Sequence, residues 1–442
     1  MRRIGIFTAL MLAAAACAPG TGSSAPPSIN PSASHEPVTI TIWGAWTGRE
    51  LKQFNSIFDG FTEQYPWITV ESVGGIGDQK IIQAINSGTP PDAVLSFGLD
   101  NVGKFCQSGA WQDLNPYFEQ TGFDTSQFPD SITQYTSYGG SRCALPFLTD
   151  AYGLYYNQDM FTEHGISEPP KTLSELVADA KELTVFNADG SIKVAGFIPW
   201  SGYYETNSVT LSTTYGCPWY DAGGTNSTFA DPCWSDLLHW QKELIDFYGG
   251  PENVQTFISG QGDEFGSKND FQTGRIAMNL DGEWRTAFIA DGAPDLNYGT
   301  APFPVPDDQV SSYGFGQVGG TIIGIPRGSA NPAEAWLLVS WMATDTDTLV
   351  FMGNFVGNVP TTFDSLQSPD LAPTPQFQTF LDIFQNPASH YKPTTPIGDG
   401  DQSAIGQVFE DWQVGAISEA DLAGRLQQAA DEVDQLLQEA VG

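Results

Sequence analysis

The feature that most constrains the fold is an alternation of strand-like and helix-like segments in the first third of the chain. Residues 38–43 (Val-Thr-Ile-Thr-Ile-Trp) have the two-residue period of a strand, and residues 51–65 place apolar side chains at helical spacing. A further strand, helix and strand are expected in order at 68–70, 80–86 and 93–95. Strands that alternate with helices favour an α/β fold around a largely parallel sheet.

The chain is long enough for two domains, and helix start signals continue towards its end. Its 442 residues exceed the usual size of one domain. Thr172 and Glu175 are spaced as a capping box, which predicts a helix after Thr172. Asn331 precedes a first-turn proline, and Ser418 opens an amphipathic stretch, so two more helices are expected there.

The charge balance excludes one class of partner. The chain has 17 basic and 52 acidic residues, a formal net charge of −35. Such a field repels phosphate backbones and anionic membrane surfaces, so we expect no nucleic-acid partner and no flat membrane contact.

The N-terminus indicates export. Arg2 and Arg3 precede an apolar stretch over 4–16, which suits a signal peptide and is too short to span a bilayer. Small residues before Cys17 resemble a bacterial lipobox, although Ala14 stands where Leu is more usual, and cleavage without lipid remains an alternative. Residues 1–17 are thus expected to be a lipoprotein signal, and the Pro/Ser/Gly-rich residues 18–37 a flexible tether.

The remaining four cysteines favour disulfides, since an exported protein meets oxidising conditions. We pair Cys217 with Cys233 and Cys106 with Cys143 on proximity in sequence, although four cysteines allow three connectivities. No Cys-x-x-Cys spacing and only four histidines occur, which argues against a zinc site.

A set of short segments, including Pro-Pro-Asp at 90–92 and Gly-x-Trp at 282–284, occurs in a recognisable order. The other segments are 40–46, 61–70, 88–89, 108–114, 145–146, 154–159, 170–172, 271–278, 324–325 and 331–342. Together they resemble the extracellular solute-binding protein family 1, the maltose-binding-protein-like receptors of carbohydrate ABC importers. The resemblance spans essentially all of 38–440.

This resemblance implies a periplasmic-binding-protein-like fold of two discontinuous α/β lobes, joined by hinge segments, with the ligand in the interlobe cleft. The first lobe is expected at 38–146 and 316–350, and the second at 147–315 and 351–442. The implied role is to capture a sugar or oligosaccharide by hinge closure and deliver it to ABC permease subunits. The implied protein is a monomer without cofactor or metal, held by its lipid on the extracellular side of the bacterial cytoplasmic membrane.

A sugar cleft needs aromatic rings for the C–H faces of the sugar and carboxylates or amides for its hydroxyls. Several segments that match the family or combine both residue types supply candidates. The candidate ligand-binding residues are Trp46, Asp100, Asp150, Trp200, Tyr203, Glu283, Trp284 and Asp401.

Each candidate has a structural alternative. Asp100, Asp150 and Asp401 could cap a helix or turn, Glu283 could be a first-turn helix acid, and Trp284 could pack in the core. Trp43, beside Trp46, is expected to be a core residue.

Catalysis is not expected. Asp281 with Glu283, or Asp399 with Asp401, could be glycosidase carboxylates, but a two-residue spacing does not define their separation in space. Nucleophile, zinc-protease and P-loop motifs are absent. A lipid-tethered adhesion or signalling protein is a further alternative. Among ligands, the near absence of Arg and Lys in the candidate segments favours a neutral oligosaccharide and leaves polyamines and other cations open.

The first prediction concerns the Ala16–Cys17 junction. Labelled fatty acid should be incorporated into the wild-type protein and not into Cys17→Ala, because the thiol is the acceptor. Gel fluorography of both proteins checks this, and equal labelling would contradict a lipoprotein.

Overall fold

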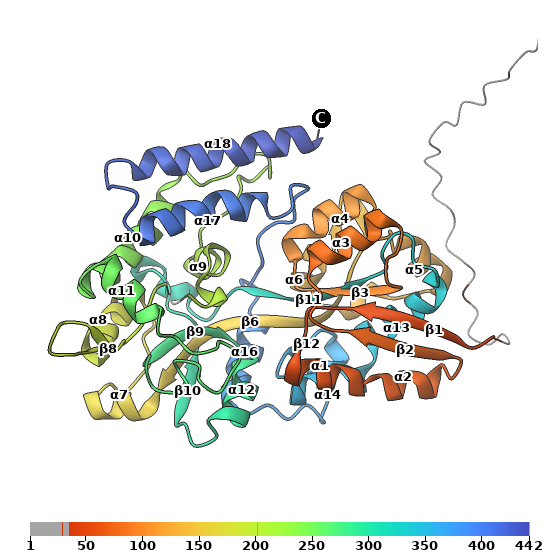
Figure 1. Cartoon of the computed structure of the whole chain (residues 1–442), viewed down its shortest axis with the longest axis horizontal. Coiled ribbons are helices and arrows are strands. Elements are labelled where there is room, and N and C mark those ends of the chain that lie inside the picture. The colour runs from red at the N-terminus through yellow and green to blue at the C-terminus, as the bar shows by residue number, and fades with distance from the viewer. Residues whose placement is uncertain (1–28, 30–34, 201, 442) are drawn as a thin grey trace, which may run out of the picture.

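One long strand, β6 (Leu145–Asn157), runs through both lobes of the molecule (Figure 1). Its residues are largely buried. We describe a computed structural model, which covers residues 29, 35–200 and 202–441. The predicted signal peptide, Cys17 and most of the tether lie outside the described residues.

The sheet of the first lobe combines parallel and antiparallel strands. β1 (Val38–Trp43) pairs in parallel with β2 (Ile68–Val73) and β3 (Ala93–Ser96), which confirms the predicted strands and their direction. β11 (Val318–Gly324) is antiparallel to both β3 and β6, and so joins the parallel edge to the long strand. The sheet is therefore less uniformly parallel than the first third of the sequence suggests, because β11 belongs to a later part of the chain.

The remaining elements of the first lobe surround this sheet (Figure 1). They are α1 (Gly48–Ser56), α2 (Phe58–Gln64), α3 (Asp78–Ser87), η1 (Leu99–Asn101), α4 (Val102–Ser108), α5 (Asn115–Thr121), η2 (Thr125–Gln127), α6 (Asp130–Thr133), η3 (Gln134–Thr136), β4 (Ser137–Tyr138), β5 (Ser141–Arg142), α13 (Pro332–Thr344), α14 (Thr346–Phe355), β12 (Val359–Pro360) and α15 (Phe363–Leu366). The helix predicted over 51–65 is two helices, separated at Ile57.

The second lobe is built on the other half of β6, which pairs with β9 (Met278–Gly282) and β10 (Tyr298–Ala301). Its other elements are α7 (Gln158–His164), α8 (Leu173–Leu183), β7 (Val185–Phe186), β8 (Ile192–Val194), η4 (Tyr204–Thr206), α9 (Ser208–Tyr215), α10 (Pro232–Phe247), α11 (Pro251–Ile258), α12 (Arg285–Gly292), η5 (Asp307–Ser312), α17 (Gly400–Gln413) and α18 (Leu422–Val441). The predicted capping box is present: the Thr172 side chain accepts from the backbone N–H of Glu175, and the carboxylate of Glu175 accepts from that of Thr172. Among the described residues, no helix is both long and apolar enough to cross a membrane.

Two clusters of buried apolar residues are present, one mainly in each lobe, and they bear on where the lobe boundary lies. Residue 350, where the first lobe was expected to end, lies inside α14. Beyond it, Met352, Val356 and Val359 pack in the first core, as does α16 (Pro375–Gln385), which lies against β6. α17 and α18 pack in the second core. We infer that the chain returns to the second lobe between α16 and α17, because a helix cannot be divided between two cores without exposing apolar surface.

Both expected disulfides are present. Cys106 of α4 bonds to Cys143, just before β6, and Cys217 after α9 bonds to Cys233 in α10. Each therefore connects a helix to a neighbouring segment of the same lobe.

The second prediction concerns the Cys217–Cys233 bond. Replacing both cysteines by serine should lower the free energy of unfolding by about 3 kcal/mol, because a loop of about 16 residues is no longer closed in the unfolded chain. Urea denaturation of the variant and the wild type measures this. Free thiols in non-reduced, alkylated wild-type protein would show instead that the bond does not form.

Candidate ligand-binding site

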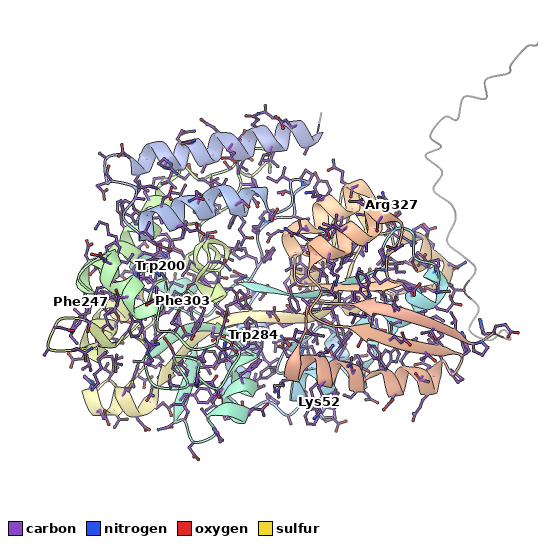
Figure 2. The ribbon with its side chains drawn as sticks, viewed as in Figure 1. Lys52, Trp200, Phe247, Trp284, Phe303 and Arg327 are labelled. Atoms are coloured by element: carbon purple, nitrogen blue, oxygen red, sulfur yellow. A yellow bond between two sulfur atoms is a disulfide. The ribbon has the colours of Figure 1, made fainter. Side chains whose placement is uncertain are left out.

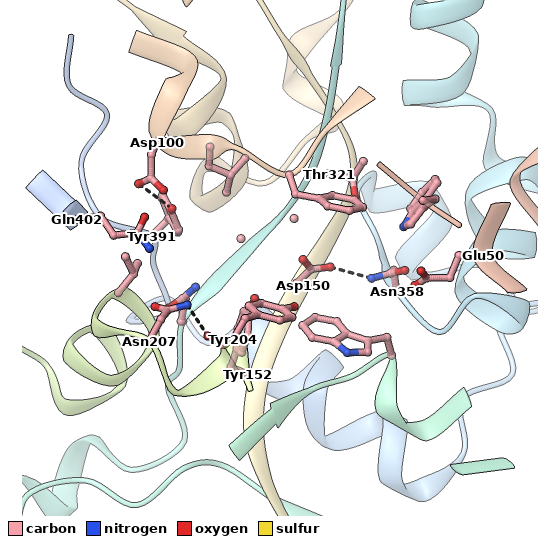
Figure 3. A pocket seen from close by; sticks show the side chains of 18 of the residues that line it. Glu50, Asp100, Asp150, Tyr152, Tyr204, Asn207, Thr321, Asn358, Tyr391 and Gln402 are labelled. Carbon is pink, nitrogen blue, oxygen red and sulfur yellow. Dashed lines mark hydrogen bonds between the residues drawn. The ribbon is translucent and has the colours of Figure 1, made fainter. Parts of the chain in front are cut away.

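A cavity of about 410 Å³ lies where β6 and β11 pass between the lobes (Figure 3). The first lobe contributes the loop after β1, the start of α1 and the segment from β3 into η1. The second lobe contributes η4, the start of α9, the end of β9 and the start of α17. The volume is within the usual range of small-molecule sites.

Aromatic rings form both walls of the cavity. On the first lobe, Phe97 is 46% exposed and its ring lies 5.9 Å from that of Trp46, centroid to centroid. On the second lobe, Tyr204 and Phe265 are 43% and 45% exposed. Tyr204 stacks on Trp284 at 5.9 Å, with 15° between the rings. Trp284 is almost fully buried, and the Tyr204 ring packs against it.

The loop that carries Phe265 is held by a buried ion pair. The Arg285 guanidinium donates to the Asp281 carboxylate at 2.6 Å and to the backbone oxygen of Glu264 at 2.7 Å. Arg285 and Asp281 are completely buried. Because a buried charge pair has little freedom to rearrange, the aromatic wall of the second lobe rests on a fixed support.

A carboxyl pair, formed by Asp150 in the centre of β6 and Glu283 just after β9, lies at the base of the cavity. Asp150 accepts a hydrogen bond from the Asn358 amide at 2.7 Å and shares another with the Glu283 side chain. Glu283 also accepts from the backbone N–H of Ala151 at 2.8 Å and from Asn358 at 3.0 Å. Burial raises the pKa of Asp150 to about 7 and that of Glu283 well above its ordinary value.

A second acid, Glu50 in the first turn of α1, faces the same region. Burial, and then the charge of Asp150, raise the pKa of Glu50 to about 7. Glu50 makes no hydrogen bond with any residue that the structure describes.

A buried lysine connects the lobes beside the cavity. The Lys392 ammonium lies 2.7 Å from the Asp100 carboxylate of the first lobe and 2.7 Å from the Asp401 carboxylate of the second. Tyr391 donates to Asp100 at 2.9 Å, and Tyr220 donates to Asp401. Asp100 and Asp401 thus share the single positive charge of Lys392.

The structure brings four of the eight candidates together. Trp46, Asp100, Asp150 and Trp284 all line the cavity. Trp46 and Trp284 are 5% and 4% exposed, so each presents only an edge to the cavity.

The other four candidates do not line this cavity. Trp200 and Tyr203 line a second cavity of about 560 Å³ along α17, which shares Asn207 and Gln402 with the first. Figure 2 shows Trp200 farther from the first lobe than Trp284. Glu283 is buried behind Asp150, and Asp401 is buried against Lys392, because both carboxylates are used for internal contacts.

Sequence reasoning missed several residues that line the cavity. The burial of the two tryptophans near the end of β1 also differs from what was expected. Trp43 was expected in the core but is only partly buried beneath Lys80, whereas Trp46 is buried among phenylalanines. Phe97 directly follows β3, so its place at a strand end was a usable signal. The side chains of Phe265 and Asn358 come from loops with no motif, and nothing in the sequence marks them.

The third prediction concerns stability and pH. Asp150 binds its proton more tightly in the folded protein than at its ordinary pKa of 3.8, so its stabilising contribution is lost as the pH rises towards about 7. The melting temperature of Asp150→Asn should therefore fall less between pH 5 and pH 8 than that of the wild type. Scanning calorimetry measures this, with the exposed Asp295→Asn as the control for loss of one charge. Equal slopes in wild type and Asp150→Asn would contradict the raised pKa.

Comparison with known proteins assigns the chain to a family. Residues 45–348 match the family of bacterial extracellular solute-binding proteins. The maltotriose-binding protein of Pyrococcus abyssi is 23% identical over 384 residues, which cover 84% of this chain and 78% of that protein. The diacetylchitobiose binding protein DasA of Streptomyces coelicolor is 23% identical over 296 residues, 66% of each chain.

A solved structure has the same architecture. CpMnBP1 with mannotriose bound superposes with a TM-score of 0.81 at 25% identity, covering 89% of this chain and 99% of that one. The two-lobed fold, the interlobe cavity and the family match agree, and the chain belongs to the bacterial extracellular solute-binding proteins.

Proposed function

We propose that this protein is the extracellular receptor of an ABC importer, and that it captures a sugar or oligosaccharide between its lobes. It is held at the outer face of the cytoplasmic membrane by a lipid on Cys17, acts as a monomer, and delivers its ligand to the permease subunits. The family is one of binding proteins, which agrees with a role in capture rather than catalysis.

The observation that carries this proposal is the pair of aromatic walls around a polar base. Phe97 on one lobe, and Tyr204 with Phe265 on the other, offer exposed ring faces at the cavity. Such faces suit the C–H faces of pyranose rings. Asp150 and Glu50 supply carboxylates at the base, which accept hydrogen bonds from hydroxyl groups.

The relatives support a saccharide. One is described as maltotriose-binding and another as diacetylchitobiose binding, and the structural neighbour holds mannotriose. These three ligands differ in their sugar units, so they support the class of ligand and not one member of it.

Hinge closure is the mechanism that the architecture favours. β6 is shared between the lobes, so a small change of backbone angles near Asp150 would move one lobe relative to the other. Ligand between the two aromatic walls would contact both lobes at once and so stabilise the closed arrangement.

The fourth prediction distinguishes an aromatic ring that contacts the ligand from a buried ring that packs behind it. Tyr204→Ala should weaken saccharide binding by about 1–3 kcal/mol with little change in melting temperature, because the ring is exposed. Trp284→Ala should weaken binding and also destabilise the fold by about 3–5 kcal/mol, because this ring is buried.

The measurement is calorimetric titration with the best ligand from a thermal-shift panel that includes maltotriose and mannotriose. Phe363→Ala, an exposed aromatic outside the cavity, is the matched control and should bind normally. Unchanged affinity in both Tyr204→Ala and Trp284→Ala would show that the ligand site lies elsewhere. A panel in which no saccharide stabilises the protein would count against the proposed function itself.

A further inference from the structure

We propose that the saccharide bound by this cavity carries a protonated amine, seated against Glu50, Asp150 and Asn358. This inference rests on the proposed sugar-binding function and specifies the class of sugar.

The first step is a surplus of hydrogen-bond acceptors. Asn358 is 5% exposed, and its amide nitrogen donates to Asp150 at 2.7 Å and to Glu283 at 3.0 Å. Its oxygen, Oδ1, is buried and has no hydrogen-bond partner among the described residues. Figure 3 shows Asn358 between Asp150 and Glu50, with Glu50 on the side away from Asp150.

The second step follows from what Glu50 can offer. An ionised carboxylate only accepts hydrogen bonds, and Asn358 Oδ1 only accepts them as well. The structure describes no donor to Asn358 Oδ1 or to the Glu50 carboxylate, so a ligand group that supplies donors is missing. A buried acceptor without a donor costs free energy, so a ligand that satisfies several of them gains affinity.

The third step concerns charge. Glu50, Asp100 and Asp150 line the cavity, and no Lys or Arg is among its described lining residues. Asp100 is paired with Lys392, which it shares with Asp401. The nearest bases to the other two acids are engaged elsewhere: Arg49 pairs with Asp291 at 2.6 Å, and Arg285 pairs with Asp281.

Glu50 and Asp150 are therefore the two lining acids without a protein counterion. Their mutual repulsion is visible in the raised pKa of Glu50, to which the charge of Asp150 contributes. A cation beside these two carboxylates relieves this repulsion, which a neutral hydroxyl group does not.

The fourth step compares the possible donors. An ammonium group donates three hydrogen bonds and carries a positive charge, whereas a hydroxyl donates one. The carboxylates of Glu50 and Asp150 line the cavity beside Asn358, whose Oδ1 is the third acceptor. The number, type and charge of the acceptors thus match an ammonium group.

The experiment compares sugars that differ in one group. Wild-type protein is titrated at pH 7 with glucosamine, 6-amino-6-deoxyglucose and glucose, with mannosamine and mannose, and with the β-1,4-linked trimers of glucosamine and glucose. We expect at least one amine to bind about tenfold more tightly than its neutral counterpart, the scale of one charge-assisted hydrogen bond. Its affinity should fall as sodium chloride is added.

The outcomes distinguish this inference from the proposed function. If neutral sugars, including maltotriose and mannotriose, bind as tightly as or more tightly than every amine, the inference is overturned and the sugar receptor stands. If no sugar of either kind binds, the proposed function is overturned, and this inference with it.

A variant tests whether the amine binds at Glu50. In Glu50→Gln the ratio of amine to neutral affinity should drop about tenfold, because one carboxylate charge is lost from an isosteric side chain. Glu63→Gln, on an exposed position of α2, removes the same charge away from the cavity and should keep the wild-type ratio. An unchanged ratio in folded Glu50→Gln, verified by circular dichroism, would overturn the assignment. If that variant does not fold, Asp150→Asn serves in its place with the same expectation.

Discussion

The two lobes depend on the backbone hydrogen bonds of one strand. β6 pairs with β11 and β12 through its first half and with β9 and β10 through its second, so both lobes are built on a single continuous ladder. A backbone ladder of this kind fixes register, because a shift of one residue would turn every buried side chain to the opposite face. Asp150 lies where the pairing changes from one lobe to the other. Its position at the base of the cavity is therefore a consequence of strand register, and not of the loops around it.

The polar residues at this point connect parts of the chain that are far apart in sequence. Asp150, Glu283 and Asn358 come from β6, from the turn after β9 and from the segment after α14. Each makes hydrogen bonds to the other two. Mutual hydrogen bonds of this kind make a buried network rigid, whereas loss of one member leaves its partners unpaired. The same contacts that hold the lobes in register thus orient the carboxylate and amide oxygens that face the ligand.

Local signals in the sequence predicted the early strands, the helix after Thr172 and both disulfides, because these depend on residues near one another in the chain. Such signals do not say which core α14 or α16 joins, since that depends on contacts with distant residues. The same contrast between local sequence signals and distant contacts applies to the candidate site. Asp150 and Trp284 were found through the family resemblance, but the exposure of Tyr204 over a buried Trp284 is a tertiary arrangement. Glu283 and Asp401 have the composition of ligand-binding residues, and only their internal partners show that they are engaged within the protein.

The ion pairs of Lys392 have a consequence for the energetics of opening. Asp100 and Asp401 belong to different lobes, while Lys392 lies on the segment that connects α16 to α17. When the lobes separate, the ammonium can remain with one carboxylate only, and the other must be hydrated to avoid an uncompensated buried charge. Opening would therefore require water to reach a site that is buried in this structure. A conformational equilibrium of this kind would be linked to water activity, so that osmotic conditions would bear on how readily the lobes separate.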